Sequence, residues 1–210
     1  MIRLLALLLA VAGLVAGCAS SGGSAKNSAS QLNGRPIGAT YQGAGLTPAQ
    51  PRPNFTLADT AGRSFAFGST TAGHPTLLYF GYTHCPDVCP TTMIDTSIAL
   101  KSLPAALQKK TYVVFVTTDV KGDSGPVLAK WLTNFTAGAQ ATFVGLTGTQ
   151  AQIDAAQAGA HVTVAEDGGQ THSSELLLYG ADNYARVAFL QSNTLQEQIS
   201  HDLPLVAAKA

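Results

Sequence analysis

Two cysteines separated by three residues carry the strongest chemical signal in this sequence. They lie in the segment Cys85-Pro86-Asp87-Val88-Cys89-Pro90, which follows an apolar run and opens a predicted helix. Along a helix, a separation of four residues spans about 6 Å and places both side chains on one face. Two cysteines at that distance can be bridged. The pair therefore predicts either a disulfide or a site that holds one metal ion between two sulfurs.

The position of the pair at a helix start indicates reactive thiols. Unpaired N–H groups at a helix N-terminus stabilise thiolates, so the pKa of cysteines there falls below about 8.5. A disulfide that closes so short a loop would constrain the unfolded chain little. Three interpretations stand at this point: a structural disulfide, a redox-active dithiol and a metal site.

A metal site would need further ligands. Two thiolates alone suit a soft monovalent ion, and divalent copper takes nitrogen ligands as well. His172 lies in a polar, glycine-rich turn, residues 168–174, ahead of an apolar strand, and a flexible loop can carry it over a site at the sheet end. His84 adjoins Cys85, but successive residues on an extended chain point apart. The remaining histidines, which we expect to be structural or on the surface, are His74, His161 and His201.

Other side chains near the cysteines have a structural explanation as well as a chemical one. Met93 carries a thioether four residues past Cys89, yet we expect it in the core. Asp87, between the thiols, and Asp119, at the end of a predicted strand, are candidates for orienting a ligand or receiving a proton; Asp87 fits equally well as a helix cap. The predicted apolar strips of this helix carry Ile94 and Ile98, and Met93 and Leu100.

Strands alternate with helices from residue 53 onward. The patterns predict a hairpin over 53–67, strands near 75–82, 112–116, 143–146, 161–165, 175–179 and 186–190, and helices near 90–103, 126–135, 150–158 and 194–209. This order predicts an α/β fold with a mostly parallel sheet that is covered by helices on both faces. In such sheets chemistry collects at the carboxyl ends of strands, and residues 82–85 leave a strand at that end.

Composition excludes several classes of protein. The chain has 210 residues, with 12 Lys+Arg against 12 Asp+Glu, so it lacks the basic excess of a nucleic-acid binder. Its 46% hydrophobic content is too high for a wholly disordered protein. Three cysteines are too few for a disulfide-scaffolded mini-protein. The sequence predicts one folded domain with short appendages.

The N-terminal region predicts export and anchoring. Residues 1–17 combine Arg3 with an apolar run too short to remain as a membrane-spanning helix. Val15-Ala16-Gly17-Cys18 resembles the bacterial lipoprotein signal, in which Cys18 is lipidated and becomes the new N-terminus; the alternative is an ordinary secretory signal beside a stray cysteine. Residues 18–52 are Ser-, Gly- and Ala-rich and predict a flexible tether, with the folded domain over 53–210. We therefore expect a domain outside the cytoplasm, anchored to the bacterial membrane by lipid.

Several of these segments together resemble the Sco/SenC proteins, thioredoxin-like copper proteins of cytochrome c oxidase assembly. The resemblance covers roughly residues 53–205 and rests on Tyr79–Pro90, Thr117–Asp119, Phe143–Gly148 and His172-Ser173. It implies a thioredoxin-like fold with a central mixed sheet flanked by helices and an N-terminal hairpin extension. It also implies that Cys85, Cys89 and His172 bind copper, as Cu⁺ or Cu²⁺.

The resemblance further favours a copper carrier over an enzyme and leaves a thiol–disulfide oxidoreductase activity open. The expected task is delivery of copper to the dinuclear copper A centre in cytochrome c oxidase subunit II, or reduction of that centre's cysteines. A thioredoxin-like reductant or a copper donor is expected as a second partner. Val120, where the family usually has Pro, and residues 121–126 depart from the family pattern and bear on partner recognition. The alternative is an extracytoplasmic thiol–disulfide oxidoreductase that acts through Cys85 and Cys89, although such enzymes usually have two residues between their cysteines.

Overall fold

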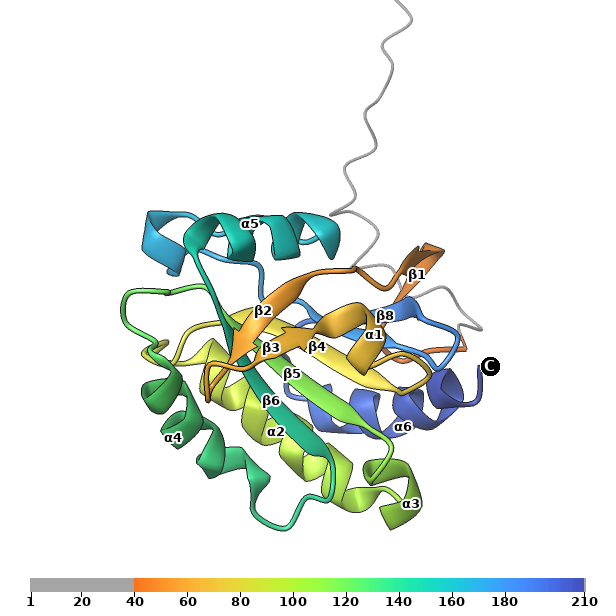
Figure 1. Ribbon diagram of the computed structural model, residues 1–210. Helices are drawn as coiled ribbons and strands as arrows, with labels where there is room; N and C mark the ends of the chain where they lie inside the picture. Colours follow the sequence, from red (N-terminus) through yellow and green to blue (C-terminus); the bar gives the residue numbers. More distant parts are fainter. Residues whose placement is uncertain (1–39, 210) are drawn as a thin grey trace, which may run out of the picture.

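An eight-stranded sheet forms the centre of the protein in the computed structural model, which describes residues 40–209 (Figure 1). The strand order is β1-β8-β7-β4-β5-β6-β2-β3. The strands are β1 (Ala44–Pro51), β2 (Thr56–Asp59), β3 (Ser64–Ala66), β4 (Thr76–Gly81), β5 (Tyr112–Thr117), β6 (Thr142–Thr147), β7 (Leu176–Tyr179) and β8 (Tyr184–Phe189). The helices are α1 (Phe67–Thr70), α2 (Val88–Ser102), α3 (Ala105–Gln108), α4 (Gly125–Thr136), α5 (Gln150–Gly159) and α6 (Leu195–Ala207), with a 3₁₀ turn, η2 (Asp167–Gly169).

The sheet is mixed. Strand β5 runs parallel to both β4 and β6, and the other strand pairs are antiparallel. The predicted α/β fold with a central mixed sheet and an N-terminal hairpin, β2–β3, is therefore confirmed. The expectation of mostly parallel strand pairing is wrong, because short turns join β2 to β3 and β7 to β8, and a short turn can only join antiparallel neighbours.

The antiparallel pairing of β7 with β4 determines where the site lies. Tyr79 is opposite Leu176 and Thr76 is opposite Tyr179, so β7 begins beside the end of β4. Residues that precede Leu176 therefore emerge at the same sheet edge as residues that follow Gly81.

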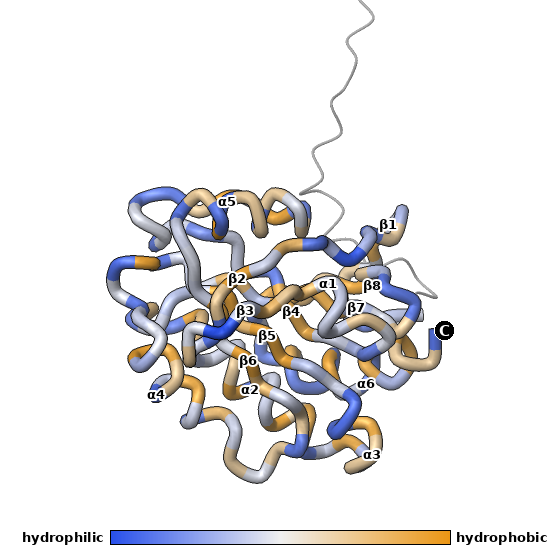
Figure 2. Tube along the Cα trace, in the orientation of Figure 1, coloured by the Kyte–Doolittle hydropathy of each residue, from blue (hydrophilic) through white to orange (hydrophobic). Residues whose placement is uncertain are grey.

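Helices cover both faces of the sheet and bury two apolar layers. All six residues of β4 are buried, and they alternate between the two layers as a strand requires. Leu77 and Tyr79 pack in the layer under α2, α4 and α6, while Leu78 and Phe80 pack in the layer with α1 and α5 (Figure 1). Figure 2 shows apolar residues along the central strands and hydrophilic residues in the outer loops. This double burial makes the end of β4 a rigid base for the segment that follows it.

The folded region begins earlier than the sequence predicted. Residues 44–51, assigned to the tether, form the edge strand β1 beside β8. The buried carboxylate of Asp202 accepts the N–H groups of Gln42, at 2.8 Å, and Gly43, at 2.7 Å, which holds the start of this strand. The predicted signal segment, Cys18 and the rest of the predicted tether up to residue 39 lie outside the described residues. No helix within residues 40–209 is long and apolar enough to span a bilayer.

The strand predicted at 161–165 is absent. His161 instead takes a left-handed conformation, with φ of 58°, just past the end of α5. The buried side-chain amide of Gln157 then donates to the carbonyl of Thr163 at 3.2 Å and accepts the N–H of Ala165 at 3.2 Å. One side chain thus supplies the hydrogen bonds that a neighbouring strand would otherwise make.

Helix α2 buries one of its two predicted apolar strips and exposes the other. Ile94 and Ile98 are 47% and 42% exposed, so the strip they form does not face the core. The buried face includes polar groups that find partners inside the protein: Ser97 donates to the carbonyl of Phe135 at 2.6 Å, and Asp95 accepts hydrogen bonds from Gln191 and Gln196. Because these groups are satisfied, they can be buried at little cost. Met93 and Leu100 are fully buried, as predicted.

Candidate metal centre

Two thiols and one imidazole meet at the carboxyl end of β4. The ligand atoms of Cys85, Cys89 and His172 all lie within 4.8 Å of one another. The Sγ atom of Cys89 is 3.6 Å from Nε2 of His172, although these residues are 83 positions apart in the sequence. Both cysteines are free thiols. The structure thus brings together the three residues that the resemblance singled out.

The turn into α2 holds the two sulfurs next to each other. Cys85 precedes the helix and Cys89 is its second residue, and the N–H of Cys89 points at Sγ of Cys85 from 3.4 Å. Pro90 occupies the first turn, where its missing N–H would have had no helical partner. At the end of β4, a Cβ on Gly81 would lie 2.8 Å from the Cys89 sulfur. The absence of a side chain there gives the sulfur room at the strand end.

The two thiols differ in their acidity. Burial raises the pKa of the Cys85 thiol, but hydrogen bonds from the backbone N–H groups of Cys89 and Asp87 outweigh it, and the pKa falls below its ordinary value of 9.0. Cys89 is fully buried, and burial raises its pKa to about 12. Cys85 is therefore the accessible, more acidic thiol of the pair, and Cys89 is the protected one.

The imidazole of His172 presents a lone pair to the sulfurs. Its Nδ1 lies 2.7 Å from the carbonyl oxygen of Ser173, and since a carbonyl can only accept, Nδ1 donates its hydrogen there. Nε2 is then unprotonated in the neutral ring and faces Cys89. The ring also packs edge-on against Tyr82, with centroids 5.6 Å apart, and against Tyr79, at 6.4 Å. These contacts fix the ring in an orientation suited to binding a metal.

Tyr79 is a neighbour of the site that the sequence did not indicate. Its hydroxyl lies 3.8 Å from Sγ of Cys89, and burial raises the pKa of this phenol well above its usual value of 10.0. The phenol therefore stays protonated and can donate to the sulfur. An inward-facing tyrosine on a strand that ends at the cysteines was the available signal.

The other candidate ligands lie outside the cluster. His84 is exposed, and its Nδ1 faces the buried carboxylate of Asp123 at 3.6 Å. Asp119 accepts the N–H of Gly122 at 2.9 Å. Asp87 stands at the N-cap of α2 but makes no capping hydrogen bond with its side chain. Three further histidines are placed elsewhere, as expected: His74 contacts the carbonyl of Lys110, His161 follows α5 and His201 lies in α6.

Comparison with known protein families matches residues 44–207 to SCO1/SenC. The chain belongs to the SCO1/SenC family.

Two bacterial proteins of the family are similar to this chain over about half its length. It is 37% identical over 118 residues to Protein SenC of Rhodobacter capsulatus, a match that covers 56% of this chain and 51% of SenC. It is 37% identical over 101 residues to a SCO2-like protein of Rickettsia prowazekii, covering 47% of this chain and 45% of that protein. The matched region thus spans about half the length of each of these relatives.

A solved structure confirms the thioredoxin-like Sco fold. The structure of Bradyrhizobium japonicum ScoI with copper bound matches with a TM-score of 0.61 and 28% sequence identity, over 74% of this chain and 99% of that one. That structure of the relative has copper bound.

The donor set in this SCO1/SenC protein fits copper. Two sulfurs and one imidazole nitrogen are soft or borderline ligands, which copper prefers, while magnesium and calcium require oxygen ligands. Among the described residues, the cluster contains no carboxylate. The site is also partly buried, which limits competition from water. The residues present therefore match the chemistry of a copper ion.

Proposed function

We propose that this protein is a copper chaperone that binds one copper ion through Cys85, Cys89 and His172 and delivers it to the copper A centre of cytochrome c oxidase subunit II. One observation carries the proposal: three donor atoms of the right type, from segments far apart in the chain, lie within 4.8 Å of one another in a SCO1/SenC protein. The copper held by the Bradyrhizobium relative supports the same metal.

The asymmetry of the ligands suits a carrier, which must both take up and release its cargo. Cys85 is partly exposed and is the first sulfur that an incoming ion meets, while Cys89 is enclosed by the core. Both thiols lose their protons when copper binds, so protons compete with the metal. The two sulfurs suffice for Cu⁺, and the imidazole favours Cu²⁺. Withdrawal of His172 would therefore favour the monovalent state and change affinity without dismantling the sulfur pair.

Copper titration of the reduced protein tests the ligand set. The purified full chain, reduced and kept anaerobic, is titrated with Cu⁺ and with Cu²⁺ and its bound copper is counted. Cys85→Ser and Cys89→Ser are expected to lose stoichiometric binding of both ions, and His172→Ala to lose affinity for Cu²⁺ selectively. Unchanged copper content in all three variants would refute the assignment.

The transfer step requires a second experiment. Equal amounts of the Cu⁺-loaded and the Cu²⁺-loaded protein are mixed with the reduced, copper-free soluble domain of subunit II, so that one ion of each state is supplied, and the absorption of the mixed-valence copper A centre is followed. The proposal predicts that this absorption appears with the wild-type protein. A mixture in which copper stays on this protein, or passes no faster than from a small copper complex, contradicts delivery.

The proposed location is outside the cytoplasm, held by a lipid on Cys18. The apolar leader and the lipoprotein-like residues 15–18 support it. A Cys18→Ala variant should no longer fractionate with membranes and should lack the lipid mass at its N-terminus. In our proposal the tether between the lipid and the folded domain ends before Gln42, because Asp202 already binds the N–H groups of Gln42 and Gly43.

A second candidate function is thiol–disulfide exchange through the same cysteines. The contrast between an accessible thiol with a lowered pKa, Cys85, and a buried thiol with a raised pKa, Cys89, is what an attacking and a resolving cysteine need. Reductase turnover on insulin by the metal-free protein, without any copper-dependent thiolate absorption, would favour this activity over copper transport.

A further inference from the structure

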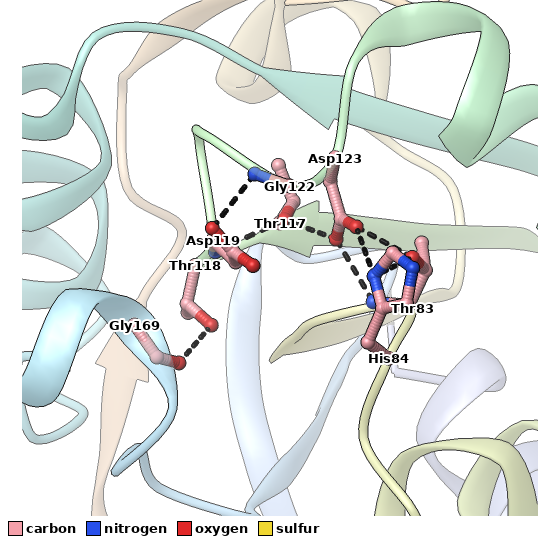
Figure 3. Close-up of polar contacts among 8 residues, drawn as sticks. All are labelled: Thr83, His84, Thr117, Thr118, Asp119, Gly122, Asp123 and Gly169. Atoms are coloured by element: carbon pink, nitrogen blue, oxygen red, sulfur yellow. Dashed lines mark hydrogen bonds and ion pairs between the residues drawn. The ribbon is translucent and has the colours of Figure 1, made fainter.

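The end of β5 contacts both segments that carry the proposed copper ligands. Thr117 and Thr118, which end the strand and follow it, are fully buried. The hydroxyl of Thr117 donates to Asp123, and that of Thr118 donates to the carbonyl of Gly169 (Figure 3). Asp123 in turn binds Thr83 in the cysteine segment, and Gly169 belongs to the histidine segment.

Asp123 joins the cysteine segment to β5. Its carboxylate is fully buried between β5 and α4, and one oxygen accepts both the N–H of Thr83 at 2.8 Å and the hydroxyl of Thr117 at 2.6 Å. The other oxygen accepts the hydroxyl of Thr83 and faces the ring of His84 (Figure 3). A buried carboxylate needs such donors to offset its lost hydration. The Asp123 carboxylate thus binds two groups of Thr83, its N–H and its hydroxyl, and the hydroxyl of Thr117 on β5. Thr83 lies two residues before Cys85, so this contact joins the cysteine segment to β5.

Thr118 joins the histidine segment to the same strand end. Its hydroxyl lies 2.6 Å from the carbonyl oxygen of Gly169, three residues before His172. Gly169 has a φ of 98°, and a Cβ there would lie 2.0 Å from the carbonyl oxygen of Thr118. The η2 turn therefore rests directly on the backbone after β5, and a bridge between Glu166 and Thr171 closes it.

We propose that Asp123 and Thr118 are positioning residues that set the separation between the sulfur pair and His172. The inference rests on the proposed copper function of the site. Neither side chain belongs to the ligand cluster, so each acts through the segment it holds. The cysteine segment and the histidine segment both contact the end of β5, and β5 itself is buried on both faces. The end of β5 thereby works as a common frame for ligands that come from separate parts of the chain.

The two residues should affect the two copper states differently. Asp123 holds the segment with the sulfurs, which both Cu⁺ and Cu²⁺ require, so its loss should weaken both. Thr118 holds the segment with the imidazole, which favours Cu²⁺, so its loss should weaken mainly that state. A loss of stability that displaces no ligand would leave the Kd for both copper states unchanged.

Matched variants of the full chain test this separation. Asp123→Asn keeps the size of the side chain but turns an N–H donor toward Thr83 or Thr117, and Thr118→Val removes one hydroxyl. Asp202→Asn changes another fully buried carboxylate that accepts backbone N–H groups, on α6. Thr111→Val removes a buried threonine hydroxyl that donates to the carbonyl of Leu107, before the opposite end of β5. These two variants are the controls for lost stability.

The Kd values for Cu⁺ and Cu²⁺ are compared among the four variants and the wild-type protein. Asp123→Asn should raise the Kd for both Cu⁺ and Cu²⁺ by about 10–100-fold, the usual effect of removing a residue that orients metal ligands. Thr118→Val should raise the Kd for Cu²⁺ by about 10-fold and change the electron paramagnetic resonance spectrum, with the Kd for Cu⁺ within about threefold of wild type. Both controls should lower the melting temperature and leave both Kd values and the spectrum unchanged.

The outcomes separate this proposal from the proposed function. If Asp123→Asn and Thr118→Val bind copper like their controls while Cys85→Ser loses it, the positioning role is overturned and the ligand set stands. If Cys85→Ser keeps its copper, the ligand set falls and this proposal falls with it. If Asp123→Asn does not fold, Thr83→Val takes its place, because it removes only the hydroxyl that donates to Asp123. Thr83→Val should then raise the Kd for both Cu⁺ and Cu²⁺, by less than Asp123→Asn would. Unchanged Kd values in Thr83→Val overturn the role of Asp123.

Discussion

Replacement of Gly81 by alanine tests how closely the end of β4 packs against the proposed copper site. A methyl group at this position would lie 2.8 Å from Sγ of Cys89, 3.1 Å from a ring carbon of Tyr79 and 3.3 Å from a ring carbon of Phe115. Non-bonded heavy atoms settle at about 3.5–4.0 Å, so the sulfur would have to move by about 0.7–1.2 Å. The two aromatic rings leave little room for the strand to move instead.

Two measurable losses follow from this displacement. Overpacking of a filled core costs about 1–3 kcal/mol, so the metal-free variant should be less stable by that amount. A metal site needs its ligand atoms within about 0.2 Å of their proper distances, so a sulfur shifted by nearly 1 Å should also weaken copper binding by about 10-fold or more. Urea unfolding of the reduced protein measures the first loss, and competition with a copper chelator measures the second.

Gly45→Ala provides the control, because this glycine also lies in a strand, β1, and its nearest neighbour is a ring carbon of Tyr41 at 3.7 Å. Alanine there makes only an ordinary contact, and it restricts the unfolded chain by the same amount as at Gly81. Gly45→Ala should therefore be as stable as wild type, or slightly more so. If Gly81→Ala matches Gly45→Ala in both stability and copper affinity, the packing account of the Cys89 sulfur is refuted.

Three further predictions concern the thiols, the metal and the domain boundary. Alkylation with iodoacetamide, read by mass spectrometry, should modify Cys85 first at neutral pH. The rate for Cys85 should rise with pH and level off above its lowered pKa, while Cys89, with a pKa of about 12, should react slowly up to pH 10. Equal alkylation rates for the two cysteines would contradict the difference in their acidity. Copper at about 100 times its Kd should add about 2.7 kcal/mol of stability in thermal unfolding, a gain that Cys89→Ser should abolish. A chain that starts at residue 53 lacks β1 and leaves the Asp202 carboxylate without two N–H donors. In urea unfolding it should be at least about 3 kcal/mol less stable than a chain that starts at residue 40. Equal stability of the two chains would show that β1 contributes nothing.

The sulfur half of the site could be predicted from the sequence because its determinants are local. The buried strand, the turn and the helix start lie within one continuous segment, Thr76–Pro90, and each has a recognisable pattern. Pro90 marks the first helical turn, and Cys85 lies in the turn just before the helix rather than on it, where the N–H of Cys89 points at its sulfur. No contact with a distant part of the chain is needed for this step.

The histidine half depends on topology that residue patterns do not determine. Had β7 run parallel to β4, as the expectation of a mostly parallel sheet implied, its first residues would have been at the opposite edge, and His172 with them. The antiparallel register, with Tyr79 opposite Leu176, brings His172 to the cysteines. The residues alone left His172 as one candidate among several, and only the resemblance to Sco/SenC proteins selected it.

The supporting residues were harder still to predict. Asp123 stands in a polar run, residues 121–126, and nothing in that run distinguishes a fully buried carboxylate from a solvated one. Its partner Thr83 is 40 positions away. The predicted strand at 161–165 failed for a similar reason, because the side chain of Gln157 replaces a strand partner there. In each case a single buried polar side chain decides the local structure through contacts that have no period in the sequence.

The most direct test of the proposed copper site is X-ray absorption spectroscopy of the Cu²⁺-loaded protein at the copper edge. The proposed ligand set predicts two sulfur neighbours and one imidazole nitrogen in the wild-type spectrum, with the imidazole signal lost in His172→Ala and one sulfur lost in either cysteine variant that retains any copper. A wild-type spectrum with fewer than two sulfur neighbours, or an imidazole signal that persists in His172→Ala, would contradict the assignment of copper to Cys85, Cys89 and His172.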